Sequence, residues 1–329
     1  MKFGVYVNPQ TATRESGREL REGMLRVVRT ADEAGFDQVM GGQHYLSDFT
    51  QLQLLPFLAR LTGEVDTMEI ATGIVLLPFY HPVEIAEQMA TIDALHDGRT
   101  VFGVGAGYRD VEFEAFDVPK RERVPRLVEG LELTRRLLTE ERVSHDGEFY
   151  SVDDVTIPIR PEEPLSVWLA ANSDRAVERA AGVADAWLVN PHSTIEEIVE
   201  QKRDHYDPIR ADAGEDASLP VIREAFVAPT SEEAFAVARE HLREKYERYV
   251  SWGQDEAMED TEDLHRPFDE LAEDRFLLGA PAEVCAEIER YEEQLDASHV
   301  VVRSHWPGLP YERACESIEL MGDEVLPNV

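Results

Sequence analysis

The stretch LLPFYHPVEIAEQMATIDALHDGRTVFGVGAGY, residues 76–108, contains the end of one apolar run, a helical pattern and a complete second apolar run. Pro82 stands at the start of the helical part, where a missing backbone N–H is tolerated. The second run, residues 101–105, leads directly into a glycine-rich turn. A strand, a helix and a second strand in this order predict a βαβ unit with parallel strands.

Eight apolar runs recur along the chain, separated by amphipathic helical patterns. They cover residues 3–7, 36–40, 68–77, 101–105, 167–171, 186–189, 221–227 and 300–303. Such near-continuous apolar strands indicate a parallel sheet that helices cover on its outer face. Eight units in 329 residues predict a (β/α)8 TIM barrel, which typically takes about 250 residues. An open doubly wound sheet is the alternative that the pattern leaves open.

The composition is strongly acidic, with 67 Asp and Glu against 32 Lys and Arg and a net charge of −35. The acids are spread along the chain, which favours a hydrated, halophilic surface over an acidic tail that binds a basic partner. At molar salt such charges are screened, because the Debye length falls to about 3 Å. Nucleic acid is not an expected partner, since phosphate binding needs a basic patch.

Several classes of protein are not expected from the sequence. Only Cys285 and Cys315 occur, both in helical patterns, which argues against a disulfide framework and for a reducing compartment. No apolar run approaches the roughly 20 residues of a membrane helix, and the first ten residues do not look like a secretion signal. The histidines lack metal-ligand spacing. We therefore expect a cytoplasmic chain without a metal site and without a membrane partner.

Two segments interrupt the alternation. Residues 143–164, VSHDGEFYSVDDVTIPIRPEEP, alternate and turn like an inserted hairpin. Residues 251–273 are rich in acids and poor in periodic apolar residues, which is typical of either a surface loop or an active-site lid. No boundary between domains is evident, so residues 1–329 are expected to form one domain with these two insertions.

Residues 76–108 resemble, nearly residue for residue, the middle of the luciferase-like monooxygenase family. The resemblance extends from Phe3 to the C-terminal PGLPYERACESIELMGDEVLP. It implies a luciferase-like TIM barrel that binds a reduced flavin or deazaflavin. In such barrels the chemistry lies where strands end at the carboxyl face, so the residues after each run are the candidates for the site.

The catalytic candidates follow the second and fourth runs. His44 lies in the sequence GGQHY, after two glycines that permit a close approach of backbone to a ligand. On the residues alone, a structural histidine is as good an interpretation as a catalytic one. The resemblance places a family active-site histidine here and matches Tyr108 to a position that faces the cavity. His44 is thus the expected acid, base or stabilising residue, with Tyr108 shaping the pocket.

The cofactor candidates after the third and fourth runs are Thr72, Gly73, Ile74, Gly105 and Gly107. In deazaflavin-dependent relatives a non-prolyl cis peptide backs the cofactor ring, and the Gly73–Ile74 bond matches it. An ordinary strand glycine is the alternative. The run GVGAGY is not a dinucleotide fingerprint, because a tyrosine replaces its third glycine and it does not open the first βαβ unit. The resemblance implies that these glycines make room beside a flavin.

The phosphate candidates follow the fifth and sixth runs. Ala171, Asn172 and Ser173 precede a helix whose N–H groups and dipole favour an anion. The family places the cofactor phosphate here, and Asn190 matches a further polar contact. Simple helix capping is the alternative for Asn172 or Ser173. Asp174 would repel a phosphate unless a neighbouring arginine offset its charge.

The resemblance implies a flavin-dependent oxidoreductase. The leading expectation is a monooxygenase that takes reduced FMN from a separate flavin reductase and uses O2 to oxidise a small organic substrate. One alternative is a hydride-transfer enzyme that uses coenzyme F-420, and another is a flavin-binding protein without turnover. A homodimer is expected by analogy with the family.

Overall fold

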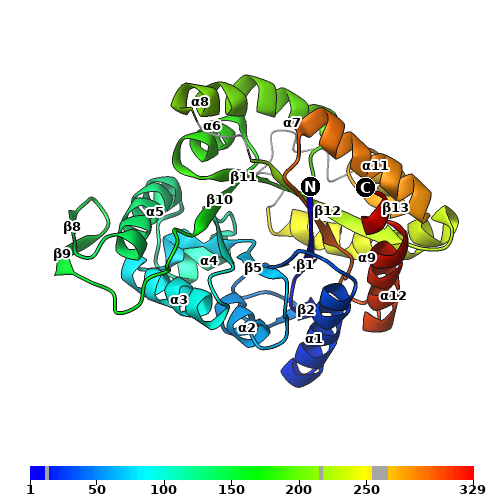
Figure 1. Cartoon of the computed structure of the whole chain (residues 1–329), viewed down its shortest axis with the longest axis horizontal. Helices are drawn as coiled ribbons and strands as arrows, with labels where there is room; N and C mark the ends of the chain where they lie inside the picture. The colour runs from blue at the N-terminus through cyan, green and yellow to red at the C-terminus, as the bar shows by residue number, and fades with distance from the viewer. Residues whose placement is uncertain (12–14, 215–217, 254–265) are drawn as a thin grey trace.

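The computed structural model describes residues 1–11, 15–214, 218–253 and 266–329. In this part of the chain eight parallel strands form a closed barrel, and each coincides with one predicted apolar run (Figure 1). The strands are β1 (Lys2–Val7), β3 (Gln38–Gly41), β5 (Glu69–Thr72), β7 (Thr100–Gly105), β10 (Ser166–Ala171), β11 (Ala186–Val189), β12 (Pro220–Val227) and β14 (His299–Arg303). Pairing of β10 with β7 closes the ring. The predicted (β/α)8 barrel is thus confirmed, and the open sheet is excluded.

Side chains from all eight strands fill the barrel. Its interior cluster consists of Tyr6, Met40, Ala71, Val101, Trp168, Ala186, Leu188, Ile222 and Val301. A second, larger cluster lies between the barrel and its helices. Both faces of each strand are therefore buried, which explains why the strands are read as continuous apolar runs without alternation.

Helices form the outer layer around the barrel (Figure 1). The longer ones are α1 (Gly17–Glu33), α2 (Leu54–Leu61), α3 (Pro82–Leu95), α5 (Arg123–Thr139), α6 (Asp174–Val183), α9 (Ser231–Ser251), α11 (Pro281–Leu295) and α12 (Tyr311–Glu324). Shorter ones are α4 (Asp110–Ala115), α7 (Ile195–Gln201), α8 (Asp207–Ala213) and α10 (Phe268–Ala272). Helix α1 begins with a capping box, in which Ser16 and Glu19 bond each other's backbone N–H.

The third predicted run is divided into two short strands. Strand β5 ends at Thr72, and β6 (Val75–Leu76) continues along β7 after an interruption of two residues. The Gly73–Ile74 peptide bond within this interruption is cis, as the resemblance predicts. The interruption turns the backbone of Gly73 and Ile74 towards the carboxyl end of the barrel.

Two regions lie beyond the eight βα units. Strands β8 (Val143–Asp146) and β9 (Ser151–Val155) pair antiparallel, and the Glu129 carboxylate accepts hydrogen bonds from the backbone N–H groups of their turn. Strand β13 (Leu277–Gly279) was not predicted, because a run of three residues is too short to recognise. It pairs in parallel with the last three residues of β12. Of the acidic segment 251–273, residues 254–265 lie outside the described residues.

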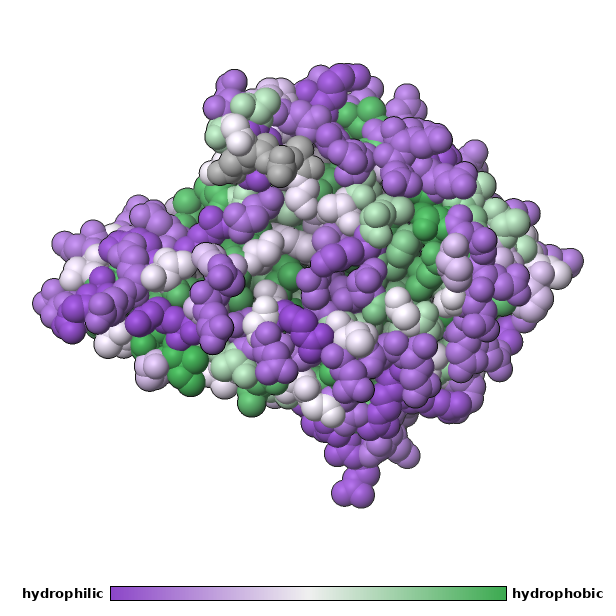
Figure 2. Space-filling model, in the orientation of Figure 1, coloured by the Kyte–Doolittle hydropathy of each residue, from purple (hydrophilic) through white to green (hydrophobic). Residues whose placement is uncertain are grey.

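Hydrophilic residues, in purple, cover most of the face shown in Figure 2, and hydrophobic residues, in green, appear in small groups among them. This is the surface that the dispersed acidic residues predict. Among the described helices, none combines the length and the apolar character that crossing a bilayer requires.

Candidate functional site

A cavity of about 510 Å³ opens at the carboxyl end of the barrel. Residues at or just after the ends of seven barrel strands line it, and Ile222 lines it from within β12. Of the predicted site residues, the structure brings together His44, Gly73, Ile74, Gly105, Gly107, Tyr108, Ala171, Asn172, Ser173 and Asn190. Thr72 does not join them, because its buried hydroxyl donates to the Gly103 carbonyl at 2.7 Å. The carboxyl-end rule for TIM barrels therefore selects residues that line one cavity.

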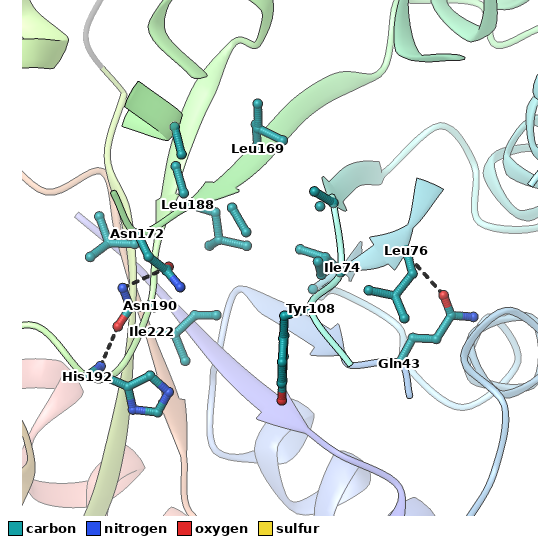
Figure 3. Close-up of a pocket in the computed structure, with 18 of the residues that line it drawn as sticks. Gln43, Ile74, Leu76, Tyr108, Leu169, Asn172, Leu188, Asn190, His192 and Ile222 are labelled. Carbon is teal, nitrogen blue, oxygen red and sulfur yellow. Dashed lines mark hydrogen bonds between the residues drawn. The ribbon is translucent and has the colours of Figure 1, made fainter. Parts of the chain in front are cut away.

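The walls of the cavity are apolar on two sides. Figure 3 shows Leu188 and Ile222 on one side, Ile74 and Leu76 on the other, and Tyr108 between them. The Tyr108 hydroxyl is buried without a hydrogen-bond partner in the described structure. Burial raises the pKa of Tyr108 well above its usual value, so its hydroxyl stays protonated and can donate a hydrogen bond.

Glycines keep backbone close to the cavity. A Cβ at Gly105 would overlap the end of the Ile74 side chain, and a Cβ at Gly73 would overlap Met40. Gly107 has φ +75°, which side chains other than glycine rarely adopt. The space that a Cβ would fill at Gly105 and Gly73 is thus taken by protein side chains, and Gly107 is required by its backbone conformation.

His44 belongs to a buried polar group at the mouth of the cavity. Its Nδ1 lies 3.3 Å from Oε1 of Glu112, a residue of α4 whose side chain is 1% exposed. The same oxygen accepts a hydrogen bond from the backbone N–H of Tyr45 at 2.8 Å and from the Arg109 guanidinium at 3.2 Å. With Nδ1 facing Glu112, the other ring nitrogen, Nε2, is left for the cavity.

Aromatic rings enclose this group. The Trp252 ring lies 5.4 Å from the His44 ring and stacks on the ring of Tyr249. The Arg109 guanidinium lies 4.2 Å from the centre of the Trp252 ring. The indole N–H of Trp252 donates to Asp48 at 3.2 Å. Trp252 and Tyr249 come from the end of α9, so this long helix reaches over the site and limits the access of water to His44.

A cationic pole, defined as Arg123, Arg175 and Arg179, lies where α5 and α6 begin beside the cavity. None of the three forms an ion pair with a residue in the described chain. Burial, and then the charge of Arg123, lower the pKa of Arg179. Ser173 is the N-cap of α6, but its side chain makes no capping hydrogen bond and remains available. Together these groups provide an anion site in an acidic protein.

The neighbouring polar residues hold the loops of this pole in place. Asn190 donates to the side-chain oxygen of Asn172 at 3.0 Å and accepts from the backbone N–H of His192 at 2.6 Å, as Figure 3 shows. The Asp174 carboxylate lies 3.3 Å from His205 and accepts a hydrogen bond from Gln201 at 3.0 Å.

A second charged group, the Glu224 cluster, consists of Glu224, Lys245, Tyr246, Arg303 and Trp306 and borders the cavity through Arg303. The buried carboxylate accepts hydrogen bonds from Lys245, from Arg303 at 3.2 Å, from Tyr246 at 3.3 Å and from Trp306 at 2.6 Å. Burial opposes ionisation of Glu224, but the two cations lower its pKa overall. Burial and the nearby Arg303 lower the pKa of Lys245 to about 7.

Sequence reasoning missed several lining residues. Arg303 ends β14 and Asn8 follows β1, so both satisfy the carboxyl-end rule that found His44. The predicted site residues, however, follow only the second to sixth runs. Arg123 begins α5 and Tyr249 lies near the end of α9, and both are far along the chain from any strand end. No local pattern points to them, because α5 and α9 reach the cavity only in the folded barrel.

Known proteins resemble this chain in sequence and in structure. The family model described as luciferase-like monooxygenase matches residues 1–298. The oxygenase component of the flavin-dependent trigonelline monooxygenase of Acinetobacter baylyi is 26% identical over 351 residues, with 99% of this chain and 95% of that protein covered. The F-420-dependent glucose-6-phosphate dehydrogenase of Amycolatopsis mediterranei is 27% identical over 330 residues, with 95% and 94% covered.

Among solved structures, the monooxygenase RslO1 from Streptomyces bottropensis has a TM-score of 0.86 at 25% sequence identity. The superposition covers 99% of each chain. The similarity therefore includes the whole barrel and the loops at its carboxyl end.

Proposed function

This chain belongs to the luciferase-like monooxygenase family and is an oxidoreductase, and we propose that it uses reduced FMN and O2 to oxidise a small organic substrate. The cationic pole beside the apolar-walled cavity carries this proposal. In a chain with 67 acidic residues, three arginines that form no ion pair within the described residues favour an anionic ligand. A phosphate attached to a flat apolar ring system fits both features.

The residues present fit FMN. Arg175, Arg179 and the N-terminus of α6 would hold the phosphate, because charged N–H donors and free backbone N–H groups favour that anion. Ile74, with the glycines around it, would support the ring system. The Tyr108 hydroxyl would then gain the hydrogen-bond partner that the protein itself does not offer.

When bound, the reduced flavin supplies the electrons and the activation of O2. His44 would hold or transfer a proton through Nε2, while Glu112 fixes the orientation of its ring from behind. Trp252 and Tyr249 would exclude water from the reacting groups. Tyr108 would orient the ligand from the middle of the cavity.

A hydride-transfer enzyme with coenzyme F-420 is the second candidate. A full-length relative, the dehydrogenase of Amycolatopsis mediterranei, uses that cofactor. The same cationic pole and His44, at the mouth of the cavity, would serve this cofactor. A flavin-binding protein without turnover is a third possibility, disfavoured by the buried pairing of His44 with Glu112 at the mouth of the cavity.

The decisive experiment is a pair of fluorescence titrations of the purified protein, one with FMN and one with coenzyme F-420. Tight FMN binding, with substrate-dependent oxygen uptake after reduction, is the expected result. Selective binding of the deazaflavin would establish the hydride-transfer alternative instead. Tight flavin binding without turnover on a panel of aldehydes, ketones and alcohols would leave the non-catalytic interpretation.

Other features of the proposal come from composition and family analogy. We expect a cytoplasmic homodimer that receives reduced FMN from a separate reductase, and a surface suited to molar salt. The dispersed acids repel one another at low salt and are screened at high salt. Analytical ultracentrifugation and thermal unfolding in 0.1 M and 3 M KCl would test the oligomeric state and the salt requirement.

A further inference from the structure

The cavity has positive charge at two places across the barrel from each other. The cationic pole lies after β10, at the starts of α5 and α6. Arg303 ends β14, which is three strands away from β10 around the ring through β11 and β12. A single phosphate cannot contact both places. The function proposed above accounts for the first and leaves Arg303 without a role.

Among the described residues, Glu224 is the carboxylate that pairs with Arg303. The Glu224 cluster contains one carboxylate and two cations, Lys245 and Arg303, all of them buried. His192 adds no negative charge, because burial and then Lys245 lower its pKa to about 3 and leave it neutral. Tyr6 is also neutral, since burial raises its pKa to about 12. Arg303 is thus the member of the Glu224 cluster that brings positive charge to the cavity.

Unsatisfied polar groups surround the same end. The Nε–H of Arg303, the Nδ1 atom of His192 and the Oδ1 atom of Asn8 have no partner in the described structure, although each side chain is less than 10% exposed. All three residues line the cavity. Buried polar groups without partners are rare in proteins, and the Arg303 Nε–H is a donor that an anionic ligand in the cavity would satisfy.

We propose that the Arg303 end of the cavity is the subsite for a carboxylate group of the substrate, so that the enzyme acts on small organic acids. This inference rests on the function proposed above. The Arg303 guanidinium would pair with the carboxylate through the N–H groups that Glu224 does not use. Ile222 and the rings of Tyr6 and Tyr249 would contact the apolar body of the acid.

The arrangement also explains the role of Glu224. It holds Arg303 from behind at 3.2 Å, while the guanidinium lies 4.2 Å above the Tyr6 ring. An arginine fixed on two sides loses little side-chain freedom when a ligand arrives. Glu224 also accepts a hydrogen bond from Lys245, so it shares its carboxylate between the two basic side chains while it positions Arg303.

The test uses benzoate and benzamide, which have nearly the same shape and differ in charge. Isothermal titration calorimetry measures the binding of each to the apoprotein and to the protein saturated with FMN. We expect benzoate to bind at least about tenfold more tightly than benzamide. Equal binding of the two probes would overturn the inference.

Two variants test whether the carboxylate of benzoate binds beside Arg303. Arg303→Gln should remove the preference for benzoate; circular dichroism checks its folding, since Glu224 loses a partner. Asn8→Asp changes a residue with one weak hydrogen bond, 3.5 Å to Tyr249, and adds a negative charge at the proposed subsite. It should lower benzoate affinity at least about tenfold and leave benzamide affinity within about twofold. Unchanged benzoate binding in Asn8→Asp would contradict the proposal.

The matched control is Asn172→Asp, which adds the same charge at the cationic pole. It should weaken FMN binding and leave the preference for benzoate intact. Failure of the wild-type protein to bind FMN would refute the proposed function alone, whereas FMN binding without a preference for benzoate would refute the carboxylate subsite alone.

Discussion

His44 and Glu112 face each other at 3.3 Å between Nδ1 and Oε1, with the carboxylate buried beneath the ring. Two further donors, the Tyr45 N–H and the Arg109 guanidinium, use the same oxygen. The carboxylate is therefore held in one place, and it selects the tautomer with a proton on Nδ1. Because α4 carries Glu112, the helix after the fourth strand orients the histidine after the second.

Glu112→Gln should lower turnover by at least about tenfold, because a neutral amide stabilises a protonated His44 less well. The amide can still accept from Tyr45 and Arg109, so the loop should keep its shape. Oxygen uptake by the reduced, FMN-loaded protein with a substrate measures turnover. Glu114→Gln, an exposed change on the same helix, is the control and should have no effect.

A double-mutant cycle separates positioning from general damage. If Glu112 acts through His44, then Glu112→Gln should have almost no further effect in a His44→Ala background. A loss of the same size in both backgrounds would show that Glu112 supports the fold and not the histidine. Full turnover of His44→Ala itself would remove the catalytic role of His44.

Arg179→Gln should weaken FMN binding by about tenfold or more and leave riboflavin binding unchanged. The two flavins share the ring system, but riboflavin lacks the phosphate that the cationic pole is proposed to hold. Fluorescence quenching on titration measures both dissociation constants. Arg121→Gln, at a side chain that is 83% exposed, is the control. Equal weakening of both flavins would place the phosphate elsewhere.

The barrel was predictable because its signal is repeated eight times. A strand buried on both faces, such as Ala186–Val189, must be apolar throughout, and the helix after it must be amphipathic. Strand β13 escaped prediction because it lies at the end of β12, outside the ring, and consists of three residues only. Strand β13 forms only by pairing with β12, and a local sequence pattern does not reveal that pairing.

The site was predictable only in part, for a related reason. His44, Gly105 and Asn190 follow strand ends, where the topology of a TIM barrel decides their position. Glu112 and Trp252 lie on helices, and their approach to His44 depends on how α4 and α9 pack. Thr72 is the opposite case. It ends β5, as the rule requires, but its hydroxyl donates to the Gly103 carbonyl.

Tyr6→Phe should lower the free energy of unfolding by about 1–2 kcal/mol. The buried Tyr6 hydroxyl donates to the Gly73 carbonyl at 2.6 Å, and its removal takes a hydrogen bond from that carbonyl. Tyr108→Phe is a matched control, because the Tyr108 hydroxyl is buried without a partner and its loss should cost nothing. Chemical denaturation of both variants measures the difference, and equal losses would contradict this explanation.

Three buried histidines should make the protein sensitive to acid. Burial is the main cause that lowers the pKa of His192 to about 3, and of His299 and His305 to about 4. Between about pH 6.5 and pH 4 the unfolded chain therefore binds protons that the native state does not, so stability falls as the pH falls. Each histidine adds up to about 1.4 kcal/mol per pH unit to this slope.

His305→Gln should reduce the slope by about one proton, because glutamine keeps hydrogen-bonding groups and does not titrate. Its stability at pH 7 should be lower than that of the wild type, since the stack of His305 on Tyr311 at 4.7 Å is lost. Urea denaturation at several pH values between 7 and 4.5 gives the slope. His81→Gln, at an exposed position, should leave the slope unchanged. If His305→Gln retained the full wild-type slope, His305 would already be protonated in the native state.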